Sequence, residues 1–143
     1  MTRIDFYLLQ DVDETARLRF ACRLAAKALG AGHTTHLHVD DQQRAEQLDE
    51  LLWAYPERRM IPHGIVSTPA AAGAPVTIGH SDPPDHDTVL VNLAGDIPGF
   101  FSRFERVAEI VLGNTREDGR IRYKYYRDRG YPLFHHELDE WET

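Results

Sequence analysis

Cysteine is nearly absent from this sequence: Cys22 is the one thiol among 143 residues. One thiol cannot form an intramolecular disulfide, and it cannot supply a thiolate-rich zinc site. Long apolar runs are also absent, since none approaches the ~20 residues that a membrane span needs. The first residues contain Asp5 and no continuous apolar stretch, unlike a signal peptide. We therefore expect a cytoplasmic protein without a membrane segment.

The glycine-rich motifs of nucleotide enzymes are missing too. Neither G-x-G-x-x-G nor G-x-x-x-x-G-K-[ST] occurs. The first predicted strand is followed by Gln-Asp-Val-Asp at 10–13, which is acidic where a bound phosphate needs glycine and exposed N–H groups. No serine lies in a nucleophile-elbow motif, and Cys22 lies on the apolar face of a predicted helix. The sequence predicts no catalytic residue.

Eight histidines are present, but their spacing fits no common metal motif. No H-E-x-x-H pair occurs, and His36 and His38 share one side of a predicted strand because side chains alternate along a strand. Surface or edge histidines explain the pattern better than metal ligands. We expect no metal and no cofactor. A small enzyme that uses the histidines remains an alternative without a supporting motif.

Apolar periodicity predicts strands that alternate with helices. The expected strands are 4–9, 34–39, 76–78, 88–93 and 108–112, with a short extended piece at 61–63. The expected helices are 14–29, a segment capped by Asp40-Asp41 and closed by Pro56, 98–107, and 115–129, where Thr115-x-x-Asp118 resembles a capping box. This order predicts an α/β fold: a mainly parallel sheet with helices on both faces.

The length fits one domain of about 100–200 residues. We expect this domain to occupy residues 1–134. Residues 135–143 are acidic, and we expect them to form a flexible C-terminal tail apart from Trp141.

The charge is unevenly distributed. The chain carries −7 overall, yet residues 116–129 hold six basic and three acidic residues, so that segment is +3 and the remainder is −10. If residues 116–129 form a helix, four residues at the spacing i, i+3, i+4 and i+7 share one face: Arg120, Tyr123, Lys124 and Arg127. We call this set the basic stripe. Such a stripe can bind an anion attached to an apolar group. A peptide C-terminus and single-stranded nucleic acid both fit, as does a solvated helix face.

A second unusual segment, 49–63, is rich in large apolar residues for a helix end and a loop: Leu51, Leu52, Trp53, Tyr55 and Met60. Aromatic residues and methionine are enriched in the centres of protein interfaces. Packing of a core beneath a loop explains the same composition. The sequence leaves both interpretations open.

Several segments, in order along nearly the whole chain, resemble one family. They are Phe6-Tyr7-Leu8-Leu9, Leu48-Asp49-Glu50-x-Leu52-Trp53-Ala54-x-Pro56, Pro62-His63, Gly73-Ala74-Pro75-Val76-x-Ile78 and Arg122-Tyr123-Lys124-x-Tyr126-Arg127. The chain resembles the chi subunit of bacterial DNA polymerase III holoenzyme. The L-D-E-x-L-W and R-Y-K-x-Y-R segments together are specific, whereas either alone would be weak.

The resemblance implies a Rossmann-like three-layer sandwich and a non-catalytic accessory subunit of the clamp-loader complex. It implies two partners, the psi subunit and the acidic, phenylalanine-ending C-terminal tail of single-stranded DNA-binding protein (SSB). Contact with DNA is then indirect. The tail-binding positions that it implies are Val111, Arg120, Tyr123, Lys124 and Arg127, and the psi-binding positions are Trp53 and Met60. Direct binding of single-stranded nucleic acid by the same helix is the alternative, against which the −7 charge argues.

Overall fold

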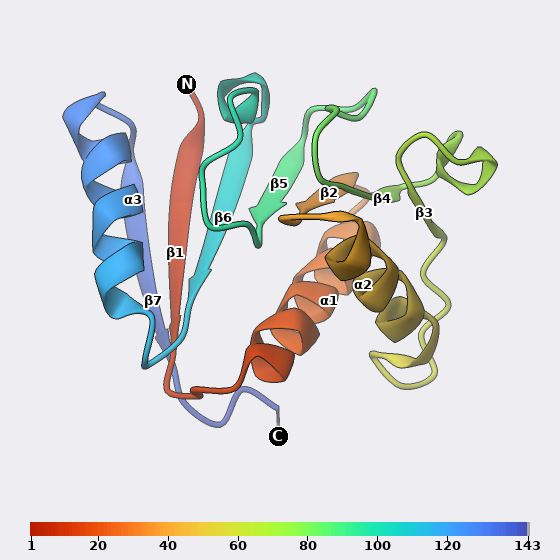
Figure 1. Cartoon of the computed structure of the whole chain (residues 1–143), viewed down its shortest axis with the longest axis horizontal. Helices are drawn as coiled ribbons and strands as arrows, with labels where there is room; N and C mark the ends of the chain where they lie inside the picture. Colours follow the sequence, from red (N-terminus) through yellow and green to blue (C-terminus); the bar gives the residue numbers. More distant parts are fainter. Residues whose placement is uncertain (143) are drawn as a thin grey trace.

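A computed structural model describes residues 1–142, which form one seven-stranded sheet with three α-helices (Figure 1). Every strand pair is parallel, and the strand order is β3-β4-β2-β5-β6-β1-β7. The strands are β1 (Arg3–Leu9), β2 (Thr35–His38), β3 (His63–Ile65), β4 (Val76–Gly79), β5 (Val89–Asn92), β6 (Arg106–Val111) and β7 (Leu133–Leu138). The helices are α1 (Glu14–Gly30), α2 (Gln42–Ala54) and α3 (Arg116–Asp128), with short 3-10 turns η1 (Pro69–Ala71) and η2 (Phe101–Arg103).

The first two helices begin where acidic side chains cap free backbone N–H groups. Asp13 accepts from the Thr15 N–H at 3.0 Å, and Asp41 accepts from the Arg44 N–H at 2.8 Å. Both residues have extended backbone at the cap position, as side-chain capping requires. The expected helices over 14–29 and after Asp41 are confirmed.

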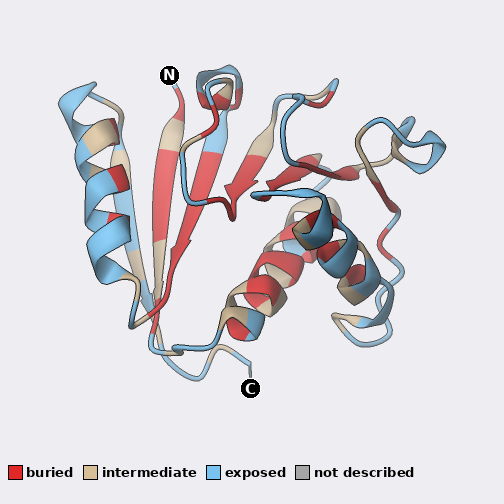
Figure 2. Cartoon of the chain, viewed as in Figure 1, coloured by how far each residue is buried: buried red, intermediate tan, exposed pale blue. Residues whose placement is uncertain are grey.

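Two apolar clusters lie on opposite faces of the sheet. Helices α1 and α2 pack on one cluster, and α3 and η2 pack on the other. Neighbouring β1 side chains alternate between them: Phe6 packs toward α3, and Leu9 packs toward α1. The central strands are buried along their length (Figure 2). The predicted α/β three-layer sandwich with a parallel sheet is confirmed.

The segment 98–107 does not form the expected helix. It contains only the turn η2, and β6 begins at Arg106, which pairs with Arg3 of β1. Phe101 and Phe104 are both buried against the sheet, so packing of these rings outweighs helix propensity here. The short extended piece expected at 61–63 is shifted to His63–Ile65.

A seventh strand, β7, lies where the sequence predicts a flexible tail over 135–143. It pairs with β1 at the sheet edge, so the expectation is wrong for residues 135–138. Trp141 follows it, packs edge-on against Phe20 at 5.2 Å and donates a hydrogen bond to Asp11 at 2.8 Å. Pairing with β1 supplies backbone hydrogen bonds that a polar sequence does not reveal. Residue 143 lies outside the described residues.

Helix α3 is held to the sheet by one buried carboxylate, that of Glu109 on β6. It accepts hydrogen bonds from Arg122 Nε at 2.8 Å, Tyr126 Oη at 2.7 Å and Asn92 Nδ2 at 3.0 Å. Burial raises the pKa of Glu109, and the Arg122 guanidinium with the hydrogen bonds from Asn92 and Tyr126 offsets part of that rise. Burial and the neighbouring Glu109 carboxylate raise the pKa of the Tyr126 phenol. These contacts fix which face of α3 remains exposed.

Removal of one partner from this network is expected to destabilise the fold. Arg122→Met leaves Glu109 buried without its cation, which should lower the free energy of unfolding by about 3–5 kcal/mol. Urea denaturation measures the change. Arg120→Met on the exposed side of the same helix is the control, with an expected change within about 0.5 kcal/mol. Equal losses in the two variants would contradict the anchoring role of Glu109.

Candidate functional site

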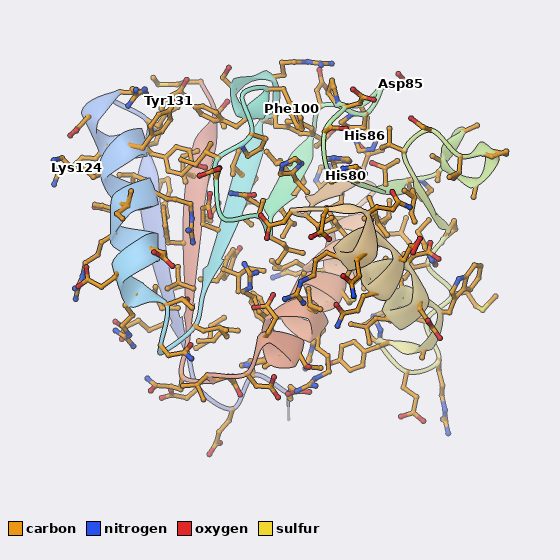
Figure 3. All side chains as sticks on the ribbon, viewed as in Figure 1. His80, Asp85, His86, Phe100, Lys124 and Tyr131 are labelled. Carbon is orange, nitrogen blue, oxygen red and sulfur yellow. The ribbon has the colours of Figure 1, made fainter. Side chains whose placement is uncertain are left out.

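The basic stripe lies on the outer side of α3. Arg120, Lys124 and Arg127 are exposed, as Figure 3 shows for Lys124. Tyr123 is half-buried instead, because its ring packs against Phe6 at 5.5 Å. The stripe therefore presents three cations to solvent beside an aromatic ring that is fixed to the sheet.

The expected capping box at the start of α3 is wrong. Thr115 makes no side-chain cap. Its Oγ1 accepts a hydrogen bond from the Leu112 N–H at 3.0 Å instead. That bond closes a tight turn between β6 and α3. The short connection keeps the first turn of α3 close to the end of β6, where Val111 lies.

A pocket of about 200 Å³ opens between α3 and the strands β1, β6 and β7. We call it the α3 pocket. Its lining comprises Phe6, Leu8, Val111, Arg116, Gly119, Arg120, Tyr123 and His135. Aliphatic and aromatic groups dominate this lining, while two guanidinium groups belong to the same wall of α3. Such a site can bind an apolar group that carries a negative charge.

Gly119 brings α3 close to β6. A Cβ atom at this position would lie 2.9 Å from Val111 Cγ2, closer than real Cβ contacts come. The helix therefore rests on Val111 at that turn, and Val111 can form part of the pocket floor. A larger side chain at position 119 requires α3 to move away from the sheet.

The structure brings three of the five predicted tail-binding residues into the pocket: Val111, Arg120 and Tyr123. Lys124 and Arg127 do not line it and lie farther along the exposed surface of α3. Arg120 pairs with Glu117 at 2.9 Å and Arg127 with Asp128 at 3.3 Å, and both pairs are exposed. Exposed pairs contribute little energy, so these cations can exchange partners readily.

Five of the lining residues were not predicted from the sequence: Phe6, Leu8, Arg116, Gly119 and His135. Arg116 stands one turn before Arg120, so the helical pattern that defined the stripe could have included it. Phe6 and Leu8 are two apart on β1 and share a face, which alternation predicts once the strand is placed. His135 could not be found this way, because its segment was expected to be a flexible tail.

The predicted psi-binding residues are exposed. Trp53, at the end of α2, is 67% exposed, and Met60, in the loop that follows, is 86% exposed. The Trp53 ring lies 4.6 Å from the His63 ring, which supports one side of it. In contrast, Leu52 is buried. In this segment Leu52 therefore belongs to the core, whereas Trp53 and Met60 remain available at the surface.

A larger groove of about 960 Å³ lies on the other face of the sheet, between α1 and strands β1, β5 and β6. The loop between Trp53 and Met60 forms one of its walls, through Tyr55, Pro56, Glu57 and Arg59. Tyr7 and Asp5 of β1 belong to its lining as well. The groove and the α3 pocket therefore use opposite sides of β1.

The histidines His36 and His38 are buried, so their interpretation as surface or edge residues is wrong. β2 lies in the middle of the sheet, between β4 and β5, and both rings pack near Phe100. His36 Nδ1 and His86 Nε2 lie 2.7 and 3.0 Å from Thr77 Oγ1. Within residues 1–142, no three His, Cys, Asp or Glu side chains are grouped so that they could hold a metal ion.

Comparisons with known proteins place the chain in a family. A family model described as DNA polymerase III chi subunit, HolC, matches residues 1–134. The chain belongs to this chi-subunit family. DNA polymerase III subunit chi of Pseudomonas aeruginosa is 41% identical over 141 residues, covering 96% of this chain and 98% of the relative. The Escherichia coli subunit of that name is 29% identical over 141 residues, covering 93% and 96%.

Membership in the chi-subunit family makes the chain a replication accessory subunit of a DNA polymerase complex. The resemblance noted from the sequence motifs is confirmed. No helix within residues 1–142 has the length and apolar content needed to cross a membrane.

The buried histidines predict acid sensitivity of this chi-family fold. Burial, with His38 and His86 nearby, lowers the pKa of His36 to about 3, while an unfolded histidine titrates near ~6.5. Below pH ~6.5 the unfolded chain therefore binds a proton that the folded chain does not. The His36 contribution to stability is complete above pH ~6.5 and is lost toward pH 3, at about 1.4 kcal/mol per pH unit.

Urea denaturation at several pH values from 7.5 to 5.5 tests this prediction. The dependence of unfolding free energy on pH should be weaker in His36→Leu than in the original chain. His33→Leu is the matched control, because His33 is exposed. An unchanged pH dependence in His36→Leu would rule out a major contribution from this residue.

Proposed function

We propose that this chi-family chain is a non-catalytic bridge in the clamp-loader complex. It binds the psi subunit on one surface and the acidic C-terminal tail of SSB on another. The observation that carries the proposal is the α3 pocket, where an apolar floor meets a basic helix on an otherwise acidic protein. This combination suits an acidic peptide with an apolar end better than it suits a nucleic-acid backbone.

Each part of an SSB tail has a counterpart in this site. The terminal phenyl ring fits the floor made by Leu8 and Val111, and the terminal carboxylate fits the guanidinium groups of Arg116 and Arg120. Acidic residues earlier in the tail would meet Lys124 and Arg127 farther along α3. The tail then runs with its C-terminal end at the first turns of the helix.

The proposed tail contact should be weak and salt-sensitive. Exposed charges are screened beyond ~8–10 Å at ordinary ionic strength. A short peptide must also lose conformational freedom on binding, so we expect micromolar affinity as an order of magnitude. Several tails on one SSB assembly, together with a tether through psi, would raise the effective concentration at the site.

The proposed psi contact uses the opposite side of the molecule. Trp53 and Met60 are large exposed apolar side chains of the kind that form interface centres. The loop between them also lines the 960 Å³ groove beside α1. A partner helix or loop that contacts these two side chains can therefore continue into a preformed apolar surface.

Direct contact with DNA is not part of the proposal. Outside residues 116–129 the chain carries −10, which repels a phosphate backbone. We propose that the chain needs no metal or cofactor and acts in the cytoplasm. Its contribution to replication is to connect polymerase subunits to SSB-coated single strands.

Loss of a stripe cation should weaken tail binding without unfolding the protein. Arg120→Ala is expected to lower the affinity for an acidic peptide ending in Asp-Phe by ~10-fold or more, since charged hydrogen bonds contribute about 1.5–3 kcal/mol. Lys124→Ala, at an exposed position outside the pocket, should lower it by less, about two- to fivefold. Isothermal titration calorimetry measures the affinity, and thermal unfolding should change little.

Arg103→Ala, at an exposed position of the turn η2, is the matched control and should bind the peptide as the original chain does. Unchanged affinity in both stripe variants would reject the site. Binding of an oligonucleotide without SSB, with a steep dependence on salt, would favour the direct nucleic-acid alternative instead.

The psi surface should be separable from the tail site. Trp53→Ala and Met60→Ala are expected to weaken capture of the cognate psi subunit in a pull-down, because truncation of a hot-spot residue at an interface centre costs about 2 kcal/mol or more. Both variants should still bind the SSB tail peptide. Lys124→Ala provides the reciprocal control and should retain psi. Normal psi capture by both apolar variants would place that interface elsewhere.

A further inference from the structure

The α3 pocket has a second wall that comes from the edge strand. His135 of β7 stands opposite Phe6 of β1 in the parallel register, and its ring lies on the α3 side of the sheet, 5.0 Å from the Tyr123 ring. His135 lines the pocket together with residues of α3. The pocket is therefore closed by two elements that are separate in the sequence.

Three aromatic rings surround this part of the pocket. The Tyr123 ring meets Phe6 at 5.5 Å with an interplanar angle of 67°, and His135 at 5.0 Å with 35°. Phe6 and His135 are 6.4 Å apart with 32° between their planes. Each ring is supported by the other two, so none must be ordered by a ligand.

We propose that His135 is a specificity-determining residue of the α3 pocket. With Phe6 and Tyr123 it forms an aromatic box that selects a peptide whose last residue is aromatic. The inference rests on the proposed binding of an SSB-type tail and adds the part of the site that reads the terminal side chain. The basic stripe recognises charge, and the aromatic box recognises the ring.

The physical basis is that aromatic pairs gain energy beyond the burial of area. Offset and edge-to-face pairs with centroids 4.5–7 Å apart are favourable in this way, and an aliphatic group cannot form them. The three box rings already stand at such distances from one another. A phenyl ring entering beside Leu8 and Val111 can meet the Tyr123 and His135 rings at similar separations.

The side chain at position 135 forms one wall of the α3 pocket but is not needed for the fold. Its side chain is exposed, whereas the neighbouring His136 contacts Asp5 at 2.9 Å and stacks on Tyr7 at 4.6 Å on the other side of the strand. Substitution at 135 should therefore change the pocket and leave the pairing of β7 with β1 intact.

The test compares two acidic peptides that differ only in their last residue, one ending in phenylalanine and one in leucine. Calorimetry measures both affinities for the original chain, His135→Ala, His135→Phe and His33→Ala. The original chain should prefer the phenylalanine peptide. His135→Ala should lose about three- to tenfold of that preference. His135→Phe should retain it because a ring remains, and the exposed His33→Ala control should behave as the original chain.

The outcomes separate this inference from the proposed function. Binding of the phenylalanine peptide with the same preference in His135→Ala would overturn the role of His135 and leave the tail site standing. Equal binding of both peptides by the original chain would overturn the aromatic box. Failure of the original chain to bind either peptide would overturn the proposed tail function and, with it, this inference. Circular dichroism confirms that each variant is folded.

Discussion

The buried carboxylate of Glu109 is the constraint on which the exposed surface of α3 depends. Arg122 and Tyr126, four residues apart on the helix, both bond to this one group. Two bonds from one face of α3 to one residue of β6 fix the rotation of α3 about its own axis as well as its distance from the sheet. As a consequence, the three cations of the basic stripe are exposed to solvent, while Tyr123 packs against the sheet. A buried charge of this kind stabilises little compared with an apolar core, but it specifies orientation.

Strand β1 connects the two proposed binding surfaces. Phe6 and Leu8 line the α3 pocket, while Asp5 and Tyr7 line the groove beside α1. Because successive side chains of a strand face opposite sides, the two surfaces lie back to back across one sheet. Partners on them would not compete for space. The proposed bridging role needs this property, since it would require psi and an SSB tail to be held at the same time.

The sequence predicts the fold well where burial is periodic and poorly where it is not. β1 is a short apolar run, α1 and α2 have helical apolar spacing and acidic caps, and the structure places all three as expected. The helix at 98–107 fails although Phe101 and Phe104 have helical spacing, because pairing of β6 with β1 begins at Arg106 and leaves room only for the turn η2. β7 fails for another reason: its partner is β1, more than one hundred residues away in the sequence, so no local pattern reveals the pairing.

The candidate site shows the same division. Helical spacing predicts that Arg120 and Tyr123 share one face of α3. The same spacing adds Arg116, which lies one turn before Arg120. Whether each cation lines the pocket depends on the bonds to Glu109, which spacing alone does not reveal. The placement of Val111 needs the tight turn at Thr115 and the missing side chain of Gly119. Local pattern thus predicts the charges, and tertiary contact decides which of them border a cavity.

His135 lies on the edge strand, apart from the helix that carries the proposed charge recognition. An edge strand has one neighbour, here β1, so the exposed His135 side chain is constrained less than the side chains of the central strands. Arg116 and Arg120 belong instead to α3, whose orientation depends on the bonds to Glu109. In the proposed site, the charge and the terminal side chain of a peptide are therefore recognised by different elements, and a substitution at position 135 would change the second without the first.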